Sequence, residues 1–242
     1  MRNSAVRFLQ KVGLLKLFIC GFVLGSAPVA TVHAAETNKV VVAYFSKDGQ
    51  ENFEKKIKPL FEEFKGDCKS CEIINATPYD AKGNFNETDM ATKLKSPPEG
   101  TSFYLFDWNQ KTNDVNRGWT EILEQKIQAG IPVLGSTGHA APDEPGSPLS
   151  RTVFGQISGA IIIGEVTGRE RMLPKSYFGP EMLTAIAAPS QHQGKEVAPL
   201  YFAGRWASSW SKRSAQEWLT HFRTKKQKSR RIFVDMNDLF VK

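Results

Sequence analysis

The chain has 242 residues, of which 40% are hydrophobic, and its formal net charge is +7. This length and apolar content allow one well-buried core and exclude a chain that is too polar to fold on its own. We expect a single α/β domain, residues 35–242, behind an N-terminal segment that is removed.

Residues 1–34 have the three parts of a secretory signal peptide. Four basic residues and no acidic ones precede an apolar stretch from Leu17 to Ala30, and Val32-His33-Ala34 is a small-residue cleavage pattern. Glycine and Pro28 interrupt the apolar stretch, which disfavours a membrane span and leaves an uncleaved anchor as the alternative. We expect export, to the periplasm or the medium. The exported chain would have no stable membrane span and a charge of +3, since four of the seven excess charges leave with the signal.

The cysteines predict a disulfide. Cys20 lies in the signal, which leaves Cys68 and Cys71 as a C-x-x-C pair. In an exported protein such a pair is expected to be a local disulfide. A redox-active pair is one alternative, but reactive thiols are usually activated at a helix N-terminus, and this pair follows a helical segment. Zinc binding is another; no second cysteine or histidine pair at ligand spacing supports it, so we expect no metal.

The first half of the domain predicts alternating strands and helices. Residues 40–45 are nearly all apolar, which is typical of a strand buried on both faces, and residues 71–76 are expected to form a second strand. Between them, apolar residues recur at three- and four-residue steps from 51 to 65, which predicts an amphipathic helix and a right-handed parallel crossover. A short helix is expected at 87–94, with Asn86 as its N-cap.

The middle of the chain continues this alternation. Residues 102–108 form a third strand, and a helix follows from Asp114 to Ala129, with Gly130 as its cap. Residues 131–136 form the fourth strand. Residues 139–150 are a proline-rich loop that is long enough to carry function.

Two further buried strands are expected at 160–163 and 183–189, joined by a polar, hairpin-like excursion that turns at 176–180. Residues 200–203 are interpreted as a small strand and residues 207–222 as a helix.

Six basic residues lie between Arg223 and Arg231. They fit either a solvated segment or a site for nucleic acid or an anionic surface. Because the charge of the rest of the domain is ordinary, we expect no nucleic-acid partner.

The run GAIIIGEV at 159–166, followed by SYFGPEMLTAIAAP at 176–189, resembles subtilisin-like serine proteases. In that family a strand of the type G-A-I-x-V-G-A is followed by S-x-x-G-x-x-V-x-x-x-A-P-G. Residues 129–138 are similar to the family's A-x-x-x-G-V-x-V-V-x-A-A-G-N unit, and V-D-x-x-x-L at 234–239 is similar to its ending. The resemblance implies a three-layer α/β fold, in which helices cover both faces of a mainly parallel sheet.

The catalytic motifs of this family are not matched. Its aspartate follows the first strand, where Ser46 stands and Asp48 is a displaced candidate. Its histidine follows the second strand, but residues 74–100 contain no histidine. Its nucleophile motif, G-T-S-x-A-x-P, has its nearest counterpart at 204–208, where Trp206 occupies the position of the serine. Without a base and a nucleophile, catalysis by the serine-protease mechanism is not expected.

The favoured hypothesis is therefore a non-catalytic, subtilase-like protein. It would bind a protein or peptide partner at the loops beyond the carboxyl ends of its strands. The binding residues would be His139, Tyr177, Arg205 and Trp206, since exposed aromatic side chains there would replace catalysis with binding; Trp210 is expected to pack in the core. In the resemblance, His139 also stands near the position of the residue that donates a hydrogen bond to the oxyanion, and its imidazole is able to donate such a bond. The alternative is that His139 is a loop histidine whose side chain faces water. No cofactor is expected.

A diverged serine hydrolase is the first alternative hypothesis. It would use His139 or His192 as the base, with Ser136, Ser208 or Ser209 as the nucleophile.

A flavodoxin-like binder of phosphate or flavin mononucleotide is the second alternative. VAYFSKDGQE at 42–51 is similar to the flavodoxin phosphate loop, in which hydroxyls at a helix N-terminus hold the phosphate. Asp48 and Glu51 stand in place of the two threonines of that loop, and carboxylates repel phosphate. A signal peptide also argues against a cytosolic flavin protein.

Overall fold

The computed structural model describes residues 39–140, 148–167, 171–193, 195–229 and 234–240. The predicted signal peptide lies outside this part of the chain, as do Arg230 and Arg231. Within the described ranges, no helix is long and apolar enough to cross a membrane.

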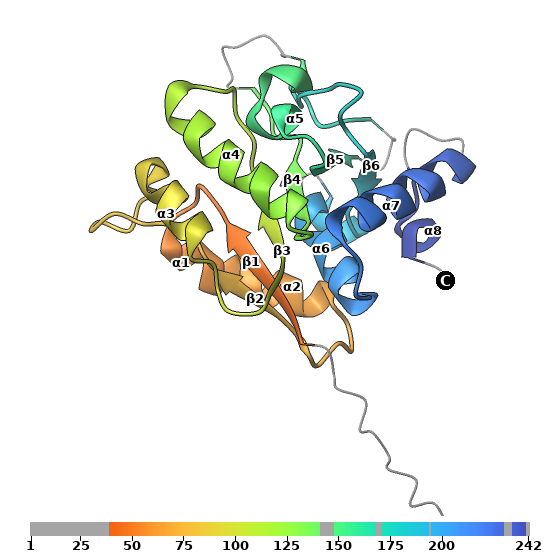
Figure 1. The fold of residues 1–242 in the computed structure, drawn as a ribbon. Coiled ribbons are helices and arrows are strands. Elements are labelled where there is room, and N and C mark those ends of the chain that lie inside the picture. Colours follow the sequence, from red (N-terminus) through yellow and green to blue (C-terminus); the bar gives the residue numbers. More distant parts are fainter. Residues whose placement is uncertain (1–38, 141–147, 168–170, 194, 230–233, 241–242) are drawn as a thin grey trace, which may run out of the picture. The chain divides into compact units, whose positions relative to one another are not determined.

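Six strands form one parallel sheet in the order β2-β1-β3-β4-β5-β6 (Figure 1). Every neighbouring pair in this sheet is parallel, and each strand falls on an apolar run that predicts one. The predicted α/β class is therefore confirmed. The strands are β1 (Val40–Phe45), β2 (Cys71–Asn75), β3 (Thr101–Phe106), β4 (Val133–Ser136), β5 (Ile161–Val166) and β6 (Thr184–Ala187).

Helices connect most of these strands. A continuous helical segment after β1 contains a π-helical turn between two α-helical parts, and a short 3₁₀ turn precedes α3. The helices are α1 (Gln50–Asn52), α2 (Lys58–Phe64), α3 (Met90–Lys95), α4 (Asp114–Gln128), α5 (Val153–Gln156), α6 (Ala198–Ser208), α7 (Ala215–Ser229) and α8 (Met236–Phe240).

A separate core lies on each face of the sheet. Val42 and Tyr44 of β1 point into the core that α2, α6 and α7 cover. Ala43 and Phe45 point into the opposite core, which α3, α4 and α5 cover. This two-residue alternation is how one strand serves both cores. The three-layer arrangement with helices on both faces is thus confirmed.

Local signals at helix ends act as the sequence predicts. Asn86 accepts a hydrogen bond from the backbone N–H of Thr88. Asn113 and Asn116 form a reciprocal capping box at the start of α4. Gly130, just past the end of α4, has a φ of +93°, a conformation that favours glycine.

Three predictions of local structure are wrong. Residues 200–203 are not a strand, since they lie inside α6. The helix predicted at 207–222 is instead two helices, because α6 ends at Ser208 and Ser214 starts α7 by bonding to Glu217. The connection from β5 to β6 is not hairpin-like, because the two strands are parallel.

Candidate functional site

Parallel strands end at one edge of the sheet, which we call the carboxyl edge; the opposite edge is the amino edge. In open α/β sheets, ligands bind beyond the carboxyl edge. In this chain Ser46, Asp107 and His139 follow β1, β3 and β4 there, and Glu165 lies near the end of β5.

Asp107 is the centre of a small polar cluster. The buried Tyr44 hydroxyl donates a hydrogen bond to Asp107 Oδ2. The Ser46 hydroxyl, 3.2 Å away, donates to the same oxygen. Ser46 Oγ in turn accepts from the backbone N–H of Asp48 at 3.1 Å. The cluster joins the ends of β1 and β3.

The surroundings of Asp107 change its acidity. Burial raises the pKa of the Asp107 carboxyl to about 7, the negative charge of Asp48 adds to this, and the hydrogen bonds from Tyr44 and Ser46 oppose it. Burial also raises the pKa of the Tyr44 phenol well above its usual value. A carboxyl group that exchanges its proton near neutral pH is a frequent mark of a functional site.

Three cavities lie at this edge in the described part of the chain. The largest, of about 700 Å³, is a cleft lined by Lys47, Asn109, Gln110, Lys111, Asn113, His139, Ala140, Pro174, Lys175 and Tyr177. A cavity of about 160 Å³ lies beside it and includes Asp107, Ser136, His139, Glu165, Ser176 and Glu196. A third, of about 150 Å³, reaches Asp107 from the side of Asp48.

His139 lies in the cleft, as the binding hypothesis expects, and it shares the small cavity with Ser136 and Ser176. Its side chain is 44% exposed, and its Nε2 lies 3.5 Å from Glu196 Oε1. Among the described residues, no hydrogen bond joins its ring to a serine hydroxyl. Ser136 Oγ instead accepts from the backbone N–H of Gly138 at 2.9 Å.

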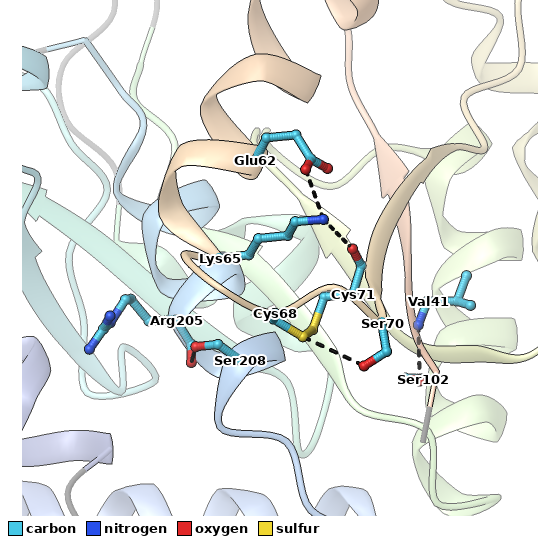
Figure 2. Close-up of a disulfide and its surroundings, with 9 residues drawn as sticks. All are labelled: Val41, Glu62, Lys65, Cys68, Ser70, Cys71, Ser102, Arg205 and Ser208. Carbon is cyan, nitrogen blue, oxygen red and sulfur yellow. Dashed lines mark hydrogen bonds and ion pairs between the residues drawn. A yellow bond between two sulfur atoms is a disulfide. The ribbon is translucent and has the colours of Figure 1, made fainter. Parts of the chain in front are cut away.

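Ser208 and Ser209 are wrong as partners for His139. Helix α6 begins at the carboxyl edge, where the N–H of Ala198 donates to Glu165 Oε2 at 2.9 Å. Its 11 residues span about 15 Å at the usual rise, so its last residue lies near the amino edge. Figure 2 shows Ser208 in the surroundings of the disulfide, which precedes β2.

No hydrogen bond joins the His192 ring to a serine hydroxyl among the described residues. Its Nε2 lies 3.1 Å from Glu63 Oε1 and its ring packs edge-on against Phe64. His192, in the loop after β6, therefore packs against the surface of α2.

The predicted binding residues separate into two groups. Trp206 is wrong as an exposed anchor, because α6 buries it fully against β3, with its ring stacked on Phe103 at 4.4 Å. Arg205 is on the same helix, near the disulfide (Figure 2), and does not line the cleft. Tyr177 lines the cleft, although only 3% of it is exposed. Trp210 packs against Phe103 as expected.

Asp48 is not the buried acid of this site. It is exposed and accepts a hydrogen bond from Asn52 Nδ2 at 2.6 Å, whereas Asp107 on β3 is the carboxyl group held between strands. Glu51, the second carboxylate of the flavodoxin-like stretch, pairs with Lys55 on the surface of the same helix. A phosphate at the start of this helix would therefore meet two like charges.

The sequence did not predict that α6 begins at Ala198. This helix follows β6 and the Ala-Pro unit, so residues 195–199, Lys-Glu-Val-Ala-Pro, occupy the place that the resemblance gives to the nucleophile motif. Glu196 and not Trp206 lies there. The overlooked signal is Pro199, because proline is favoured in the first turn of a helix.

Cys68 and Cys71 form a disulfide, with their Cα atoms 5.5 Å apart (Figure 2). Lys65 Nζ donates to the Cys71 carbonyl at 2.6 Å and pairs with Glu62 at 2.8 Å. The disulfide closes the turn between α2 and β2. Within the described ranges, no group of three potential metal-ligating side chains is found.

Comparisons with known proteins give the fold. No protein-family profile and no curated protein matches the sequence. Among solved structures, the self-cleaved protease domain of PatA matches with a TM-score of 0.57 and 11% identity, over 84% of this chain and 96% of that one. A lanthipeptide protease matches with 0.55 and 11%, over 80% of each chain. The prenylagaramide maturation protease PagA matches with 0.51 and 12%, over 76% and 82%. The chain has a subtilisin-like fold.

Proposed function

We propose that this protein is a non-catalytic member of the subtilisin-like fold that binds a protein or peptide partner in the cleft at the carboxyl edge. The observation that carries the proposal is the separation of His139 from Ser208 and Ser209. Ser208 and Ser209 lie at the C-terminal end of α6, whereas His139 follows β4 and lines the cleft of about 700 Å³ at the carboxyl edge.

The likeness in fold supports a peptide as the ligand. The solved structures with this fold include a protease that is named for a lanthipeptide and one that is named for the maturation of prenylagaramide. The cleft lies at the edge where α/β sheets bind ligands, and its volume is in the range of about 300–1,000 Å³ that is usual for binding sites.

A diverged hydrolase is the competing function. Ser136 and Ser176 line the small cavity with His139, so these two serines replace Ser208 and Ser209 as its candidate nucleophiles. A fluorophosphonate probe separates the two functions. We expect no labelling of the purified protein under conditions in which an active subtilisin-like protease is labelled. Labelling that Ser136→Ala or Ser176→Ala abolishes would contradict the proposal.

Binding is tested with immobilised peptides of varied sequence. We expect a subset of peptides to retain the protein, and His139→Ala to weaken this retention. Ser208→Ala is the matched control, because its hydroxyl is exposed at the other end of α6 and bonds only to the Arg205 carbonyl among the described residues. Equal effects of both substitutions would argue against the cleft.

Export is part of the proposal. The disulfide and the signal-like sequence of residues 1–34 support it, because disulfides persist in oxidising compartments. Fractionation of the producing cell, with N-terminal sequencing of the mature chain, tests it; we expect a mature chain beginning after Ala34. The flavin alternative predicts a yellow protein, whereas our proposal predicts a colourless one.

A further inference from the structure

A cavity at the amino edge, separate from the cleft, combines aromatic side chains with a cation. Its volume is about 480 Å³, and its residues come from the end of α6, the loop after it, α7 and α8. Aromatic surface with a few polar groups is typical of sites for small molecules. We call this space the tryptophan cavity. Its described lining includes Ser209, Trp210, Ser211, Arg213, Trp218 and Phe240.

The aromatic wall of the tryptophan cavity is held in place by the core. The ring centre of Trp210 lies 5.4 Å from that of Trp206 and 5.4 Å from that of Trp218. Phe240 packs against Phe202, with their ring centres 5.2 Å apart. Trp210 and Phe240 are only partly buried, so part of each ring is left to contact a ligand. A wall that is already ordered binds a ligand at a lower entropic cost than a mobile one.

Arg213 is the cation of this cavity. Its guanidinium carbon lies 4.8 Å from the centre of the Trp218 ring, a cation–π contact that holds the side chain over the indole. The residue is exposed, and no ion pair joins it to a carboxylate in the described part of the chain. The N–H groups of its planar guanidinium are therefore left for a carboxylate, whose geometry they match.

Glu217 is the carboxylate on which the charge of Arg213 acts, but it is used elsewhere. Hydrogen bonds from the N–H and the hydroxyl of Ser214, both 2.7 Å long, lower the pKa of the Glu217 carboxyl, and the charge of Arg213 adds to this. Glu217 thus serves the start of α7 and does not line the tryptophan cavity.

Hydrogen-bond donors lie beside this cation. The hydroxyls of Ser209 and Ser211 make no side-chain hydrogen bond within the described ranges. Trp218 Nε1 is buried and has no hydrogen-bond partner there either. Because buried polar groups are normally hydrogen-bonded, an unpaired donor at a cavity favours a ligand that accepts hydrogen bonds.

The charge of the described lining is positive. No Asp or Glu is part of it. Burial lowers the pKa of the His221 imidazole, the charge of Arg213 adds to this, and a hydrogen bond to the Leu239 backbone opposes it. His221 is therefore mainly neutral at pH 7, and the positive charge comes from Arg213.

We propose that the tryptophan cavity binds a small molecule that carries a carboxylate on an aromatic body. The carboxylate pairs with Arg213 and accepts hydrogen bonds from the serine hydroxyls, while the aromatic body lies against Trp210 and Phe240. This site is independent of peptide binding in the cleft, so the inference adds a second ligand at the opposite edge of the sheet.

Isothermal titration calorimetry of the purified protein tests the proposal. Phenylpropionate is the probe, its amide is the neutral counterpart, and propionate lacks the ring. We expect phenylpropionate to bind about fivefold more tightly than the amide, because only the acid forms an ion pair with the exposed Arg213. Higher salt should reduce this difference. Propionate should bind more weakly than phenylpropionate, since it buries no ring.

Variants of Arg213 locate the site. Arg213→Gln should remove the preference for the acid, a loss of about fivefold, and leave binding of the amide unchanged. Arg213→Lys keeps the charge without the planar pair of donors, so its loss should be intermediate. Lys212→Gln is the matched control, because it removes the same charge from the neighbouring exposed residue, which does not line the cavity. Its affinity for phenylpropionate should equal that of the unaltered protein.

Several results would overturn the inference. Equal affinity for the acid and the amide would remove the carboxylate from it. Equal losses in Lys212→Gln and Arg213→Gln would show a general charge effect, and loss of phenylpropionate binding in His139→Ala would move the ligand to the cleft. Tighter binding of a peptide that ends in phenylalanine would replace the small molecule with a peptide terminus. Absence of phenylpropionate binding would refute this inference alone, because peptide binding in the cleft is measured separately.

Discussion

The two edges of the parallel sheet differ in what they expose. At the carboxyl edge the ends of the strands hold Asp107 between β1 and β3, and two of the three cavities there include His139. At the amino edge, the disulfide closes the turn before β2 beside a cavity of about 680 Å³, and α6 ends in Ser208 next to packed tryptophans. The carboxyl edge gathers Asp107, Glu165 and His139 around its cavities, whereas the amino edge combines the disulfide with the tryptophan cluster.

The comparison shows how the proposed non-catalytic function would fit a fold shared with proteases. In the subtilisin-like proteases that the sequence resembles, the nucleophilic serine lies at the start of the helix that follows the Ala-Pro strand. Here Glu196 and Val197 come directly before that helix, and its serines come at its C-terminal end. Because Ser208 and Ser209 come at the end of α6, these candidate hydroxyl groups lie at the amino edge and not in the cleft of about 700 Å³.

The largest expected effect comes from the packed side of this comparison. Trp206→Ala should lower the free energy of unfolding by about 3–5 kcal/mol, because the ring is fully buried between Phe103 and Trp218. Trp210→Ala, at a partly buried ring, should cost less. Chemical denaturation measures both. A Trp206→Ala protein of normal stability that has lost peptide binding would make Trp206 a ligand residue after all.

Reduction of the disulfide is the second change at the amino edge that should lower the free energy of unfolding. Reduction should lower the free energy of unfolding by about 2 kcal/mol, the chain-entropy value for so short a loop. Urea denaturation with and without dithiothreitol measures it, and the double variant Cys68→Ser/Cys71→Ser should not respond to the reductant. Peptide binding should be the same in the oxidised and reduced proteins, unless the two edges are coupled.

The third effect lies at the carboxyl edge and depends on pH. The pKa of Asp107 is raised to about 7 in the folded protein, so between about pH 4 and pH 7 the folded state binds more protons than the unfolded one. Stability contributed by this group is therefore complete at low pH and is lost as the pH rises through 7. Asp107→Asn should remove this loss.

Unfolding measured at pH 5 and pH 8 tests this prediction. At pH 8 the Asn variant should be more stable than the unaltered protein, and at pH 5 this advantage should be smaller. An exposed control, Asp80→Asn, changes a carboxylate whose pKa is lowered by backbone hydrogen bonds, so Asp80 is ionised in both the folded and the unfolded state at pH 5 and at pH 8, and this variant should show no such change between the two pH values. Identical profiles for Asp107→Asn and the unaltered protein would contradict the raised pKa.

The strands were predictable because buried parallel strands leave a local pattern of short apolar runs. Helix α6 was not, since residues 200–203, Leu-Tyr-Phe-Ala, are apolar in a helix that is buried nearly all round, and such a run is also typical of a strand. Only Pro199 distinguishes the two.

The candidate site was predictable only in part, because its contacts are long-range. His139 and Tyr177 were found from their place in loops, and both line the cleft. Asp107 was missed because its partner Tyr44 is 63 positions away, and the order of the strands brings them together. Trp206 was misassigned because the same residue type anchors ligands on surfaces and packs in cores.

Glu165 gives the start of α6 an electrostatic character of its own. The side chain is 5% exposed and its carboxylate accepts the N–H of Ala198, so it offsets the partial positive charge of the helix start. During peptide hydrolysis negative charge develops on the substrate's carbonyl oxygen and has to be stabilised by free donors. A serine grafted at position 196 would generate that charge close to a fixed carboxylate. If the protein is non-catalytic, as proposed, building a protease site here would therefore require the removal of Glu165 as well, and the helix would lose the hydrogen bond to the Ala198 N–H.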